Sequence, residues 1–211
     1  MSAPAPVIPR HAATLVLLRD RRGVPEVLMG QRGRAASFMP DKVVFPGGSL
    51  DPSDTTHTIA APFRPSCAQR LTLRTDAPET AQGLGVAAIR ETREETGLRL
   101  GGDGAPDLSI LRFFFRAVTP PGLPKRFDAR FFLATAHHVS GNLDDFAGAD
   151  GELSHLQWID LDKTATMPLP FITNVVIGEV KAWIERGADW DEDRAVPFFT
   201  HDETGSRFEP L

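Results

Sequence analysis

The chain has 211 residues, of which 41% are hydrophobic and 24% charged, a formal net charge of −5, and a single cysteine, Cys67. This composition is typical of one globular domain, and it excludes both an intrachain disulfide framework and a cysteine-based zinc site. The mildly acidic balance argues against a nucleic-acid-binding surface, so we expect no nucleic-acid partner. An anionic substrate would need a local cluster of positive charge or a bound cation.

Residues 1–10 hold three prolines and no apolar core segment. We therefore expect a flexible arm rather than a secretory signal, followed by a single domain over residues 11–211. Apolar runs stay well below 18 residues, so we expect no membrane contact through a spanning helix. A cytoplasmic location is the corresponding prediction.

The first half of the chain reads as short strands joined by turns. In chain order the expected elements are a strand at 12–18, a charged turn at 19–23, a strand at 27–31, a loop at 34–40, a strand at 43–45 and a tight turn at 46–48. The first two strands are expected to form a hairpin. The next segment, up to Thr80, is irregular, with at most a short helix near 68–73.

A helix is predicted at 86–96. Gly83 and Gly85 each cost about 1 kcal/mol inside a helix, so the segment before Val86 is expected to be irregular. In that segment Asp76 and Glu79 resemble a capping box, with Pro78 in the first turn. Gly97 fits the position just after the last helical residue.

Strands and helices alternate irregularly in the second half. The expected elements are strands at 108–118 and 127–136, an acidic loop at 141–151, a strand at 156–159, an amphipathic helix at 171–186 and a final strand pair around Phe198 and Phe199. The absence of a regular strand–helix rhythm predicts an α+β fold with a mixed sheet.

The chemistry-bearing segment is Arg90-Glu91-Thr92-Arg93-Glu94-Glu95-Thr96-Gly97-Leu98. On a helix Glu91, Glu94 and Glu95 share one face, where like charges repel unless a cation lies among them. Oxygen-only, carboxylate-rich groups suit Mg²⁺ or Mn²⁺. The alternative is an ordinary solvated acidic helix face. That alternative would not explain why Gly97 ends the helix and why a glycine turn at Gly47 and Gly48 precedes it in the sequence.

This segment resembles the second half of the Nudix box, and Phe45-Pro46-Gly47-Gly48 resembles the strand and turn that open it. Thr92 stands where the family usually has an apolar residue. Gly48 and Arg90 are 42 positions apart instead of 14, so the box is split by an insertion at about 52–80. Counting forward from Gly48 puts the first acid of the box at Asp54, whereas counting back from Arg90 gives Gln82, with Glu79 nearby. This position stays unassigned.

The resemblance implies a Nudix fold, an α/β/α sandwich, and a hydrolase that cleaves the phosphoanhydride of a nucleoside diphosphate linked to another moiety. Carried over to this sequence, Mg²⁺ or Mn²⁺ would be held by the carbonyl of Gly47 and by Glu91, Glu94 and Glu95. Glu91 would bind the cation or act as a base, and Arg90 would orient the glutamates. Glu152, six residues before Trp158, resembles a further catalytic acid of the family; an ordinary loop acid is the equal alternative.

The split box also resembles a branch that acts on coenzyme A and acyl-CoA. Two segments carry this likeness, Phe38 to Asp51 and Arg126 to Phe132. Arg32 matches a CoA-signature arginine in spacing and is our candidate for substrate binding, whereas Ser37 and Asp41 depart from that signature. Other basic residues that could meet phosphates are Arg34, Lys42, Lys125, Arg126 and Arg130, for which solvated surface charge is the simpler interpretation.

Two further functions remain open. One is hydrolysis of ADP-ribose or of a dinucleotide, and the other is a Nudix-like nucleotide sensor without catalysis. The expected partner is a small nucleotide, and a homodimer is possible. For the insertion, gating of the substrate site is the working hypothesis.

Overall fold

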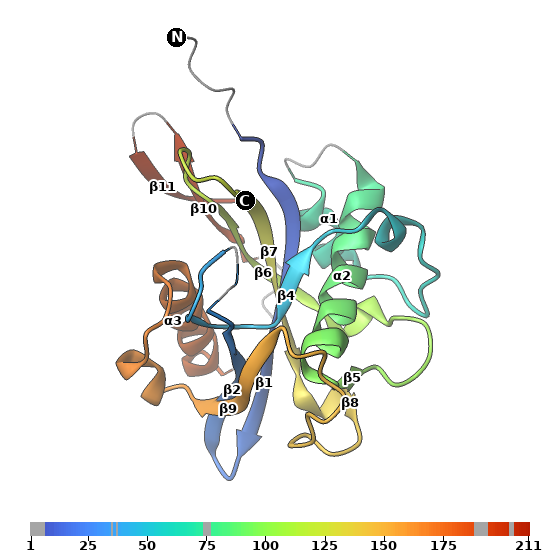
Figure 1. Ribbon diagram of the computed structural model, residues 1–211. Helices are drawn as coiled ribbons and strands as arrows, with labels where there is room; N and C mark the ends of the chain where they lie inside the picture. Colours follow the sequence, from blue (N-terminus) through green and yellow to red (C-terminus); the bar gives the residue numbers. More distant parts are fainter. Residues whose placement is uncertain (1–6, 35, 37, 74–76, 188–193, 203–204) are drawn as a thin grey trace.

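The computed structural model of the chain describes residues 7–34, 36, 38–73, 77–187, 194–202 and 205–211. A central sheet lies between two helical layers (Figure 1). Helices α1 (Pro65–Leu71) and α2 (Pro78–Thr96) lie on one side, and α3 (Phe171–Glu185) lies on the other. The predicted α+β sandwich with a mixed sheet is confirmed.

The main sheet has the order β11-β10-β6-β7-β1-β2-β3, with β4 paired to β1 and β9 paired to β2. Its strands are β1 Arg10–Arg21, β2 Val24–Arg32, β3 Val43–Val44, β4 Gly47–Ser49, β6 Arg112–Val118, β7 Phe127–Thr135, β9 Leu153–Asp160, β10 Pro197–Asp202 and β11 Gly205–Pro210. The long β1–β7 pair is parallel, whereas β1 and β2 form the expected antiparallel hairpin.

Short elements connect these strands. They are the 3₁₀ turns η1 Pro52–Thr56, η2 Leu108–Ile110, η3 Ala136–His138 and η4 Lys163–Thr166, and a two-stranded sheet of β5 Arg99–Leu100 and β8 Val139–Ser140. Arg10, placed by the sequence at the end of the arm, begins β1, and residues 1–6 lie outside the described part. Among the described helices none is long and apolar enough to cross a membrane.

Each face of the sheet buries its own apolar cluster. Along β7 the side chains alternate, so Phe132 packs in the cluster that contains residues of α2, while Phe131 and Leu133 pack in the cluster that contains residues of α3. In the α2 cluster Phe132 stacks on Phe63, at 5.7 Å between ring centroids. Residues of the insertion are therefore built into the core on the α2 side.

The start of α2 corrects the sequence analysis. The helix begins at Pro78 rather than Val86 and includes both glycines, and its N-cap is Ala77, which makes no side-chain capping bond. Asp76, the expected cap, lies outside the described residues. Gly83 and Gly85 lower the helix propensity of this segment, but neighbouring side chains lie too close for a larger residue. A Cβ on Gly83 would lie 2.9 Å from side-chain carbons of Leu50 and Thr55.

Gly85 provides a test of this close approach. A Cβ at Gly85 would overlap the ring of Phe63, which is itself buried. We expect Gly85→Ala to lower the free energy of unfolding by about 1–3 kcal/mol, because overpacking outweighs the gain in helix propensity. The matched control is Gly178→Ala in α3, where nothing lies within 4 Å of the added carbon and stability should rise by up to about 1 kcal/mol. Urea denaturation measures both, and stabilisation by Gly85→Ala would contradict the prediction.

Candidate functional site

Arg90 on α2 is the centre of an ion-pair network. Its Nε and Nη2 donate to the two carboxylate oxygens of Asp54, at 2.9 and 3.0 Å. Its Nη1 donates to Glu91 and to Glu94, both at 2.9 Å, and Nη2 also reaches the carbonyl of Ser49 at 3.2 Å. One guanidinium therefore ties the helix face to the glycine turn and to η1.

Asp54 is the residue that the sequence left undecided. It is 1% exposed, and the backbone N–H of Asp51 donates to its second oxygen at 2.8 Å, as one half of a capping box at the start of η1. The forward count from Gly48 pointed to this residue, and the capping pattern Asp51-x-x-Asp54 was the signal that could have decided it. Gln82 instead donates to the carbonyl of His57 at 3.3 Å, so Asp54 supplies the carboxylate that holds Arg90.

The two glycines of the turn are required by close contacts. The N–H of Gly47 donates to Oε2 of Glu95 at 2.7 Å, and a Cβ at Gly47 would overlap the β1 backbone at Ala13 and Thr14. A Cβ at Gly48 would overlap the carboxylate of Glu91. The turn thus packs directly against the acidic face of α2. The β1 backbone requires glycine at position 47, whereas a side chain at position 48 would displace the carboxylate of Glu91.

Burial perturbs two of the glutamates. Desolvation raises the pKa of Glu95 to about 8, although the N–H of Gly47 and the charge of Arg32 act in the opposite direction. Burial also raises the pKa of Glu91, against the opposing effect of Arg90. The side chain of Glu94 is 48% exposed, so solvent exposure increases from Glu95 through Glu91 to Glu94.

Arg32 and Glu152 lie together at the other side of the turn. Arg32, the last residue of β2, donates to Glu152 at 3.2 Å, and the two side chains are 18% and 54% exposed. Both line the same cleft as Gly47, Gly48 and Glu91. The structure therefore brings the sequence-predicted residues of the site into one region, from four separate stretches of the chain.

The donor set fits a hard divalent cation by its chemistry. Oε1 of Glu95 is buried and has no hydrogen-bond partner within the described residues, so it has an acceptor position to offer. The other donors are carboxylate oxygens, which Mg²⁺ and Mn²⁺ prefer. In the described part of the chain, no three acidic, histidine or cysteine side chains are already gathered as a ligand group. A cation would have to draw the glutamates together.

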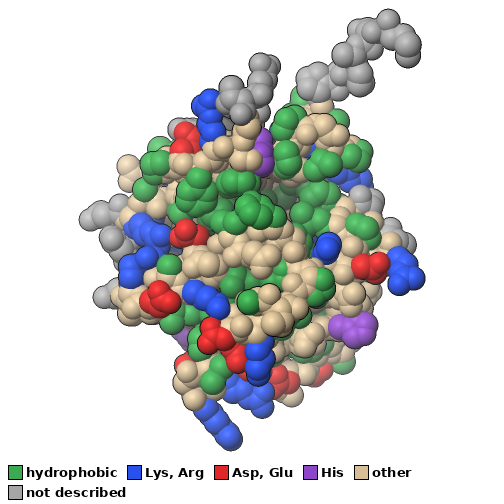
Figure 2. All heavy atoms as spheres, turned by 90° about the vertical axis from the view of Figure 1, so that its left-hand side faces the viewer, with side chains coloured by type: hydrophobic (Ala, Val, Ile, Leu, Met, Phe, Trp, Pro, Cys, Tyr) green, Lys and Arg blue, Asp and Glu red, His purple; other side chains and the backbone are tan. Residues whose placement is uncertain are grey.

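A large apolar cleft begins at these acidic groups. It has a volume of about 1000 Å³ and runs from Glu91, Glu152 and the glycine turn to the N-terminus of α3 and strand β10. Figure 2 shows hydrophobic side chains gathered around a hollow on the α3 side of the molecule. Its apolar and aromatic lining includes Ile8, Phe38, Leu123, Phe127, Phe131, Phe171, Ile172 and Phe199.

The basic residues near the cleft divide into two groups. Arg32, Lys125 and Arg126 line it. Arg130 does not, because it is fully buried and forms an ion pair with Asp128 at 2.9 Å. Arg34 is 92% exposed at its side chain and pairs with Asp41, as expected of surface charge.

Comparison with known proteins defines the class. The crystal structure of a Nudix hydrolase from Alicyclobacillus acidocaldarius superposes with a TM-score of 0.62 at 30% sequence identity, covering 81% of this chain and 90% of that one. No family model matches the chain. The fold, the site and this similarity together show that the chain belongs to the Nudix hydrolase family.

More distant relatives agree with this assignment. The chain is 28% identical to the Caenorhabditis elegans protein named "Putative nudix hydrolase 7" over 72% of its own length, and it spans about half (51%) of that relative. An Ap4A hydrolase of C. elegans, solved as a binary complex, shares the fold with a TM-score of 0.52 at 20% identity, over 84% of this chain and 98% of that one.

Removal of the Asp54 charge should loosen the network. We expect Asp54→Asn to lower the free energy of unfolding by about 1–3 kcal/mol. The reason is that a buried carboxylate, which accepts two hydrogen bonds from Arg90, loses its charge. The control is Asp103→Asn, which breaks the exposed pair of Asp103 with Arg99 and should change stability by no more than about 0.5 kcal/mol. Equal effects of the two variants in urea denaturation would contradict this prediction.

The buried Glu95 predicts a pH dependence for the cation-free protein. Folded Glu95 keeps its proton to about pH 8, whereas the unfolded chain loses it near the ordinary value of 4.5. The folded state therefore binds more protons between these values, and stability should fall as the pH rises through this window. In a chelating buffer the Tm of the wild type should decline from pH 5 to 8 more steeply than that of Glu95→Gln. Parallel curves would contradict the assignment.

Proposed function

We propose that the protein hydrolyses the phosphoanhydride bond of a nucleoside diphosphate linked to a second moiety, with Mg²⁺ or Mn²⁺ as cofactor and CoA or an acyl-CoA as substrate. The products would be adenosine 3′,5′-bisphosphate and the (acyl)phosphopantetheine. The observation that carries the proposal is the large apolar cleft that opens directly from the Arg90–glutamate network.

In this proposal the carboxylates of Glu91, Glu94 and Glu95 and the carbonyl of Gly47 hold the cation. When bound, it supplies charge neutralisation at the phosphoryl oxygens and lowers the pKa of water. Arg90 holds Glu91 and Glu94 in fixed orientations through two 2.9 Å bonds. Arg32 meets a substrate phosphate by exchanging its 3.2 Å contact with Glu152 for the incoming anion.

The proton from the attacking water needs a base near the glycine turn. Glu91 is our first candidate, because burial raises its pKa and makes it a better proton acceptor than an exposed glutamate. Glu152 is the second candidate, since its side chain is more exposed and reaches the same cleft. Single Glu→Gln variants at both positions would assign the role through the loss of the acidic limb in the pH–rate profile.

The cleft lining favours CoA over ADP-ribose. Phe171 and Phe199 approach within 5.8 Å between ring centroids at the end of the cleft distant from the glutamates. An acyl or pantetheine chain gains free energy against such groups, whereas the hydroxyls of a second ribose gain no hydrogen bond from an aromatic ring.

The second candidate is a dinucleotide substrate. Phe38 and Phe127 form an edge-to-face pair at 4.9 Å in the wall of the cleft, and aromatic side chains of this kind stack on a base. A neighbour with the same fold is an Ap4A hydrolase. At about 1000 Å³ the cleft has room for more than one nucleoside.

One screen distinguishes the substrates. CoA, acyl-CoAs, ADP-ribose, NADH and Ap4A are incubated with the protein and Mg²⁺ or Mn²⁺, and the products are separated by chromatography. We expect the highest kcat/KM for CoA or an acyl-CoA. Strong ADP-ribose turnover with no CoA turnover would overturn the CoA proposal, and tight nucleotide binding without any product would support a sensor function instead.

Glu94→Gln tests the catalytic assignment. We expect kcat to fall by about 100-fold or more, because the variant removes a charge from the proposed cation site. Glu79→Gln, in the exposed first turn of the same helix, is the control and should retain activity. Unchanged turnover by Glu94→Gln on the best substrate of the screen, with a normal melting temperature, would show that the assignment is wrong.

A further inference from the structure

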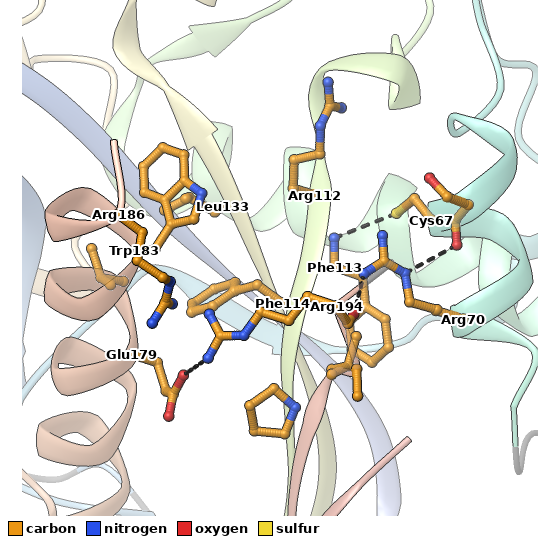
Figure 3. A pocket seen from close by; sticks show the side chains of 15 residues that line it. Cys67, Arg70, Arg112, Phe113, Phe114, Leu133, Glu179, Trp183, Arg186 and Arg194 are labelled. Carbon is orange, nitrogen blue, oxygen red and sulfur yellow. Dashed lines mark hydrogen bonds and ion pairs between the residues drawn. The ribbon is translucent and has the colours of Figure 1, made fainter. Parts of the chain in front are cut away.

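Two peripheral segments are held by arginine side chains, and one of them leads into the cleft. In the pocket of Figure 3, Arg70 of α1 donates to the carbonyl of Arg194 at 2.8 Å and so joins the insertion to the C-terminal segment. None of the described residues that line this pocket also lines the cleft. The second segment is the acidic loop (residues 141–151), which Arg19 holds and which leads directly to Glu152 in the cleft lining.

The beginning of the acidic loop is held against the sheet by Arg19 of β1 and Trp158 of β9. Nη1 of Arg19 donates to Asp144 at 2.8 Å, while its Nε donates to Glu26 of β2 at 2.7 Å. The guanidinium also lies 4.4 Å from the ring centroid of Trp158, whose Nε1 donates to the carbonyl of Leu143 at 2.9 Å. The side chain of Arg19 is 10% exposed, so the loop starts from a largely buried anchor on the sheet.

The end of the acidic loop is held against the C-terminal end of α2 (Figure 1). The backbone N–H of Asp150 donates to the carbonyl of Glu94 at 2.8 Å, which satisfies one of the carbonyls that the last helical turn leaves open. Gly97 and Gly148 are in close contact, because a Cβ at Gly97 would lie 2.9 Å from backbone atoms of Gly148. The loop is therefore fixed to the helical turn that carries Glu94, a proposed cation ligand.

The side chain of Asp150 extends this connection to Glu152. Its Oδ1 accepts the backbone N–H of Glu152 at 2.8 Å, in a turn that the aspartate side chain closes. Two consecutive hydrogen bonds thus join the backbone of Glu94 to that of Glu152. Burial is the main cause that raises the pKa of Glu91 and of Glu95, and the charge of Glu152 adds to this effect in both. The carboxylate of Glu152 therefore lies close enough to act on both glutamates.

We propose that Asp150 is a positioning residue, which holds the backbone of Glu152 so that this carboxylate keeps its place opposite the glutamates of α2. The role rests on the hydrolytic function proposed above. Because the side chain of Glu152 is 54% exposed, its placement depends strongly on the backbone that carries it. A displacement of about 1 Å in a reacting group can lower a rate by about 100-fold.

A double-mutant cycle tests whether Asp150 acts through Glu152. Asp150→Ala removes the acceptor of the Glu152 N–H, and we expect kcat on the best substrate of the screen to fall by about tenfold without a rise in KM. In the Glu152→Gln background the same substitution should change kcat by less than about twofold, because the group that it positions is gone. Asp150→Asn keeps a side-chain carbonyl as acceptor and should restore most of kcat, which separates the hydrogen bond from the charge.

The matched control lies in the same loop. Asp145 is also exposed, and its Oδ1 accepts the N–H of Ala147 at 3.0 Å in the same kind of turn. Asp145→Ala removes the same charge and the same kind of bond and should keep the kcat of the wild type. Arg70→Gln, in the pocket of Figure 3, removes an arginine bond outside the cleft and should also keep kcat. Melting temperatures of all variants show whether each remains folded.

Hydrogen exchange, followed by NMR on the full chain, tests the same bonds without any substrate. The amides of Asp150 and Glu152 should be protected in the wild type, since both donate hydrogen bonds. The amide of Glu152 should exchange faster in Asp150→Ala and at the wild-type rate in Asp145→Ala. An unprotected Glu152 amide in the wild type would show that the positioning bond does not persist in solution, and the proposal would be wrong.

Failure of the positioning role differs from failure of the proposed function. If the wild type hydrolyses its substrate, an unchanged kcat in Asp150→Ala, or an equal loss with and without Glu152→Gln, overturns the positioning role alone. A higher KM with an unchanged kcat would also overturn it, because Asp150 would then act on substrate binding. If the wild type hydrolyses nothing in the screen, the function and the role in it both fail. Faster exchange of the Glu152 amide in Asp150→Ala would then show only that Asp150 holds this backbone.

Discussion

The guanidinium of Arg90 is the interaction on which the site depends. Three carboxylates and one carbonyl accept bonds from it, and these acceptors come from α2, η1 and the glycine turn. Without it, Glu91 and Glu94 would repel each other across one helical turn. Asp54, which is buried, fixes the guanidinium from the other side and raises its pKa through hydrogen bonding, so the arginine stays charged.

The two apolar clusters give this network a rigid support. One face of α2 packs into the sheet with residues that are almost fully buried, such as Leu84 and Ala88, while Arg90 and Glu94 face the turn. Thr92 falls on the buried face and is 0% exposed, where its hydroxyl donates to the carbonyl of Ala88 at 2.7 Å. That bond explains why a polar residue is accepted at an apolar position of the motif.

Local patterns were enough for part of this structure. The hairpin, the helix end at Gly97 and the strand at Phe127–Thr135 follow from alternation and turn residues, and the spacing of Glu91, Glu94 and Glu95 predicted their common face. The strand expected at 108–118 begins only at Arg112, because Leu108–Ile110 forms a 3₁₀ turn capped by Asp107. The beginning of α2 could not be predicted, because Gly83 and Gly85 are selected by contacts with Thr55 and Phe63, which are distant in sequence. The first acid of the box was left undecided between two counts, although the local capping pattern Asp51-x-x-Asp54 favoured Asp54.

The ion pair between Asp54 and Arg90 also explains the position of the insertion. Asp54 and Arg90 are 36 residues apart here instead of the 8 of an uninterrupted motif. Loop-closure entropy grows only with the logarithm of length, so this extension costs about 1 kcal/mol. Close contacts of Gly83 with Leu50 and Thr55 secure the two ends of the loop, and its helix α1 lies along β6, away from the cleft lining. The described residues of the insertion therefore add surface without contributing to the lining of the cleft, which argues against substrate gating by this part of the chain.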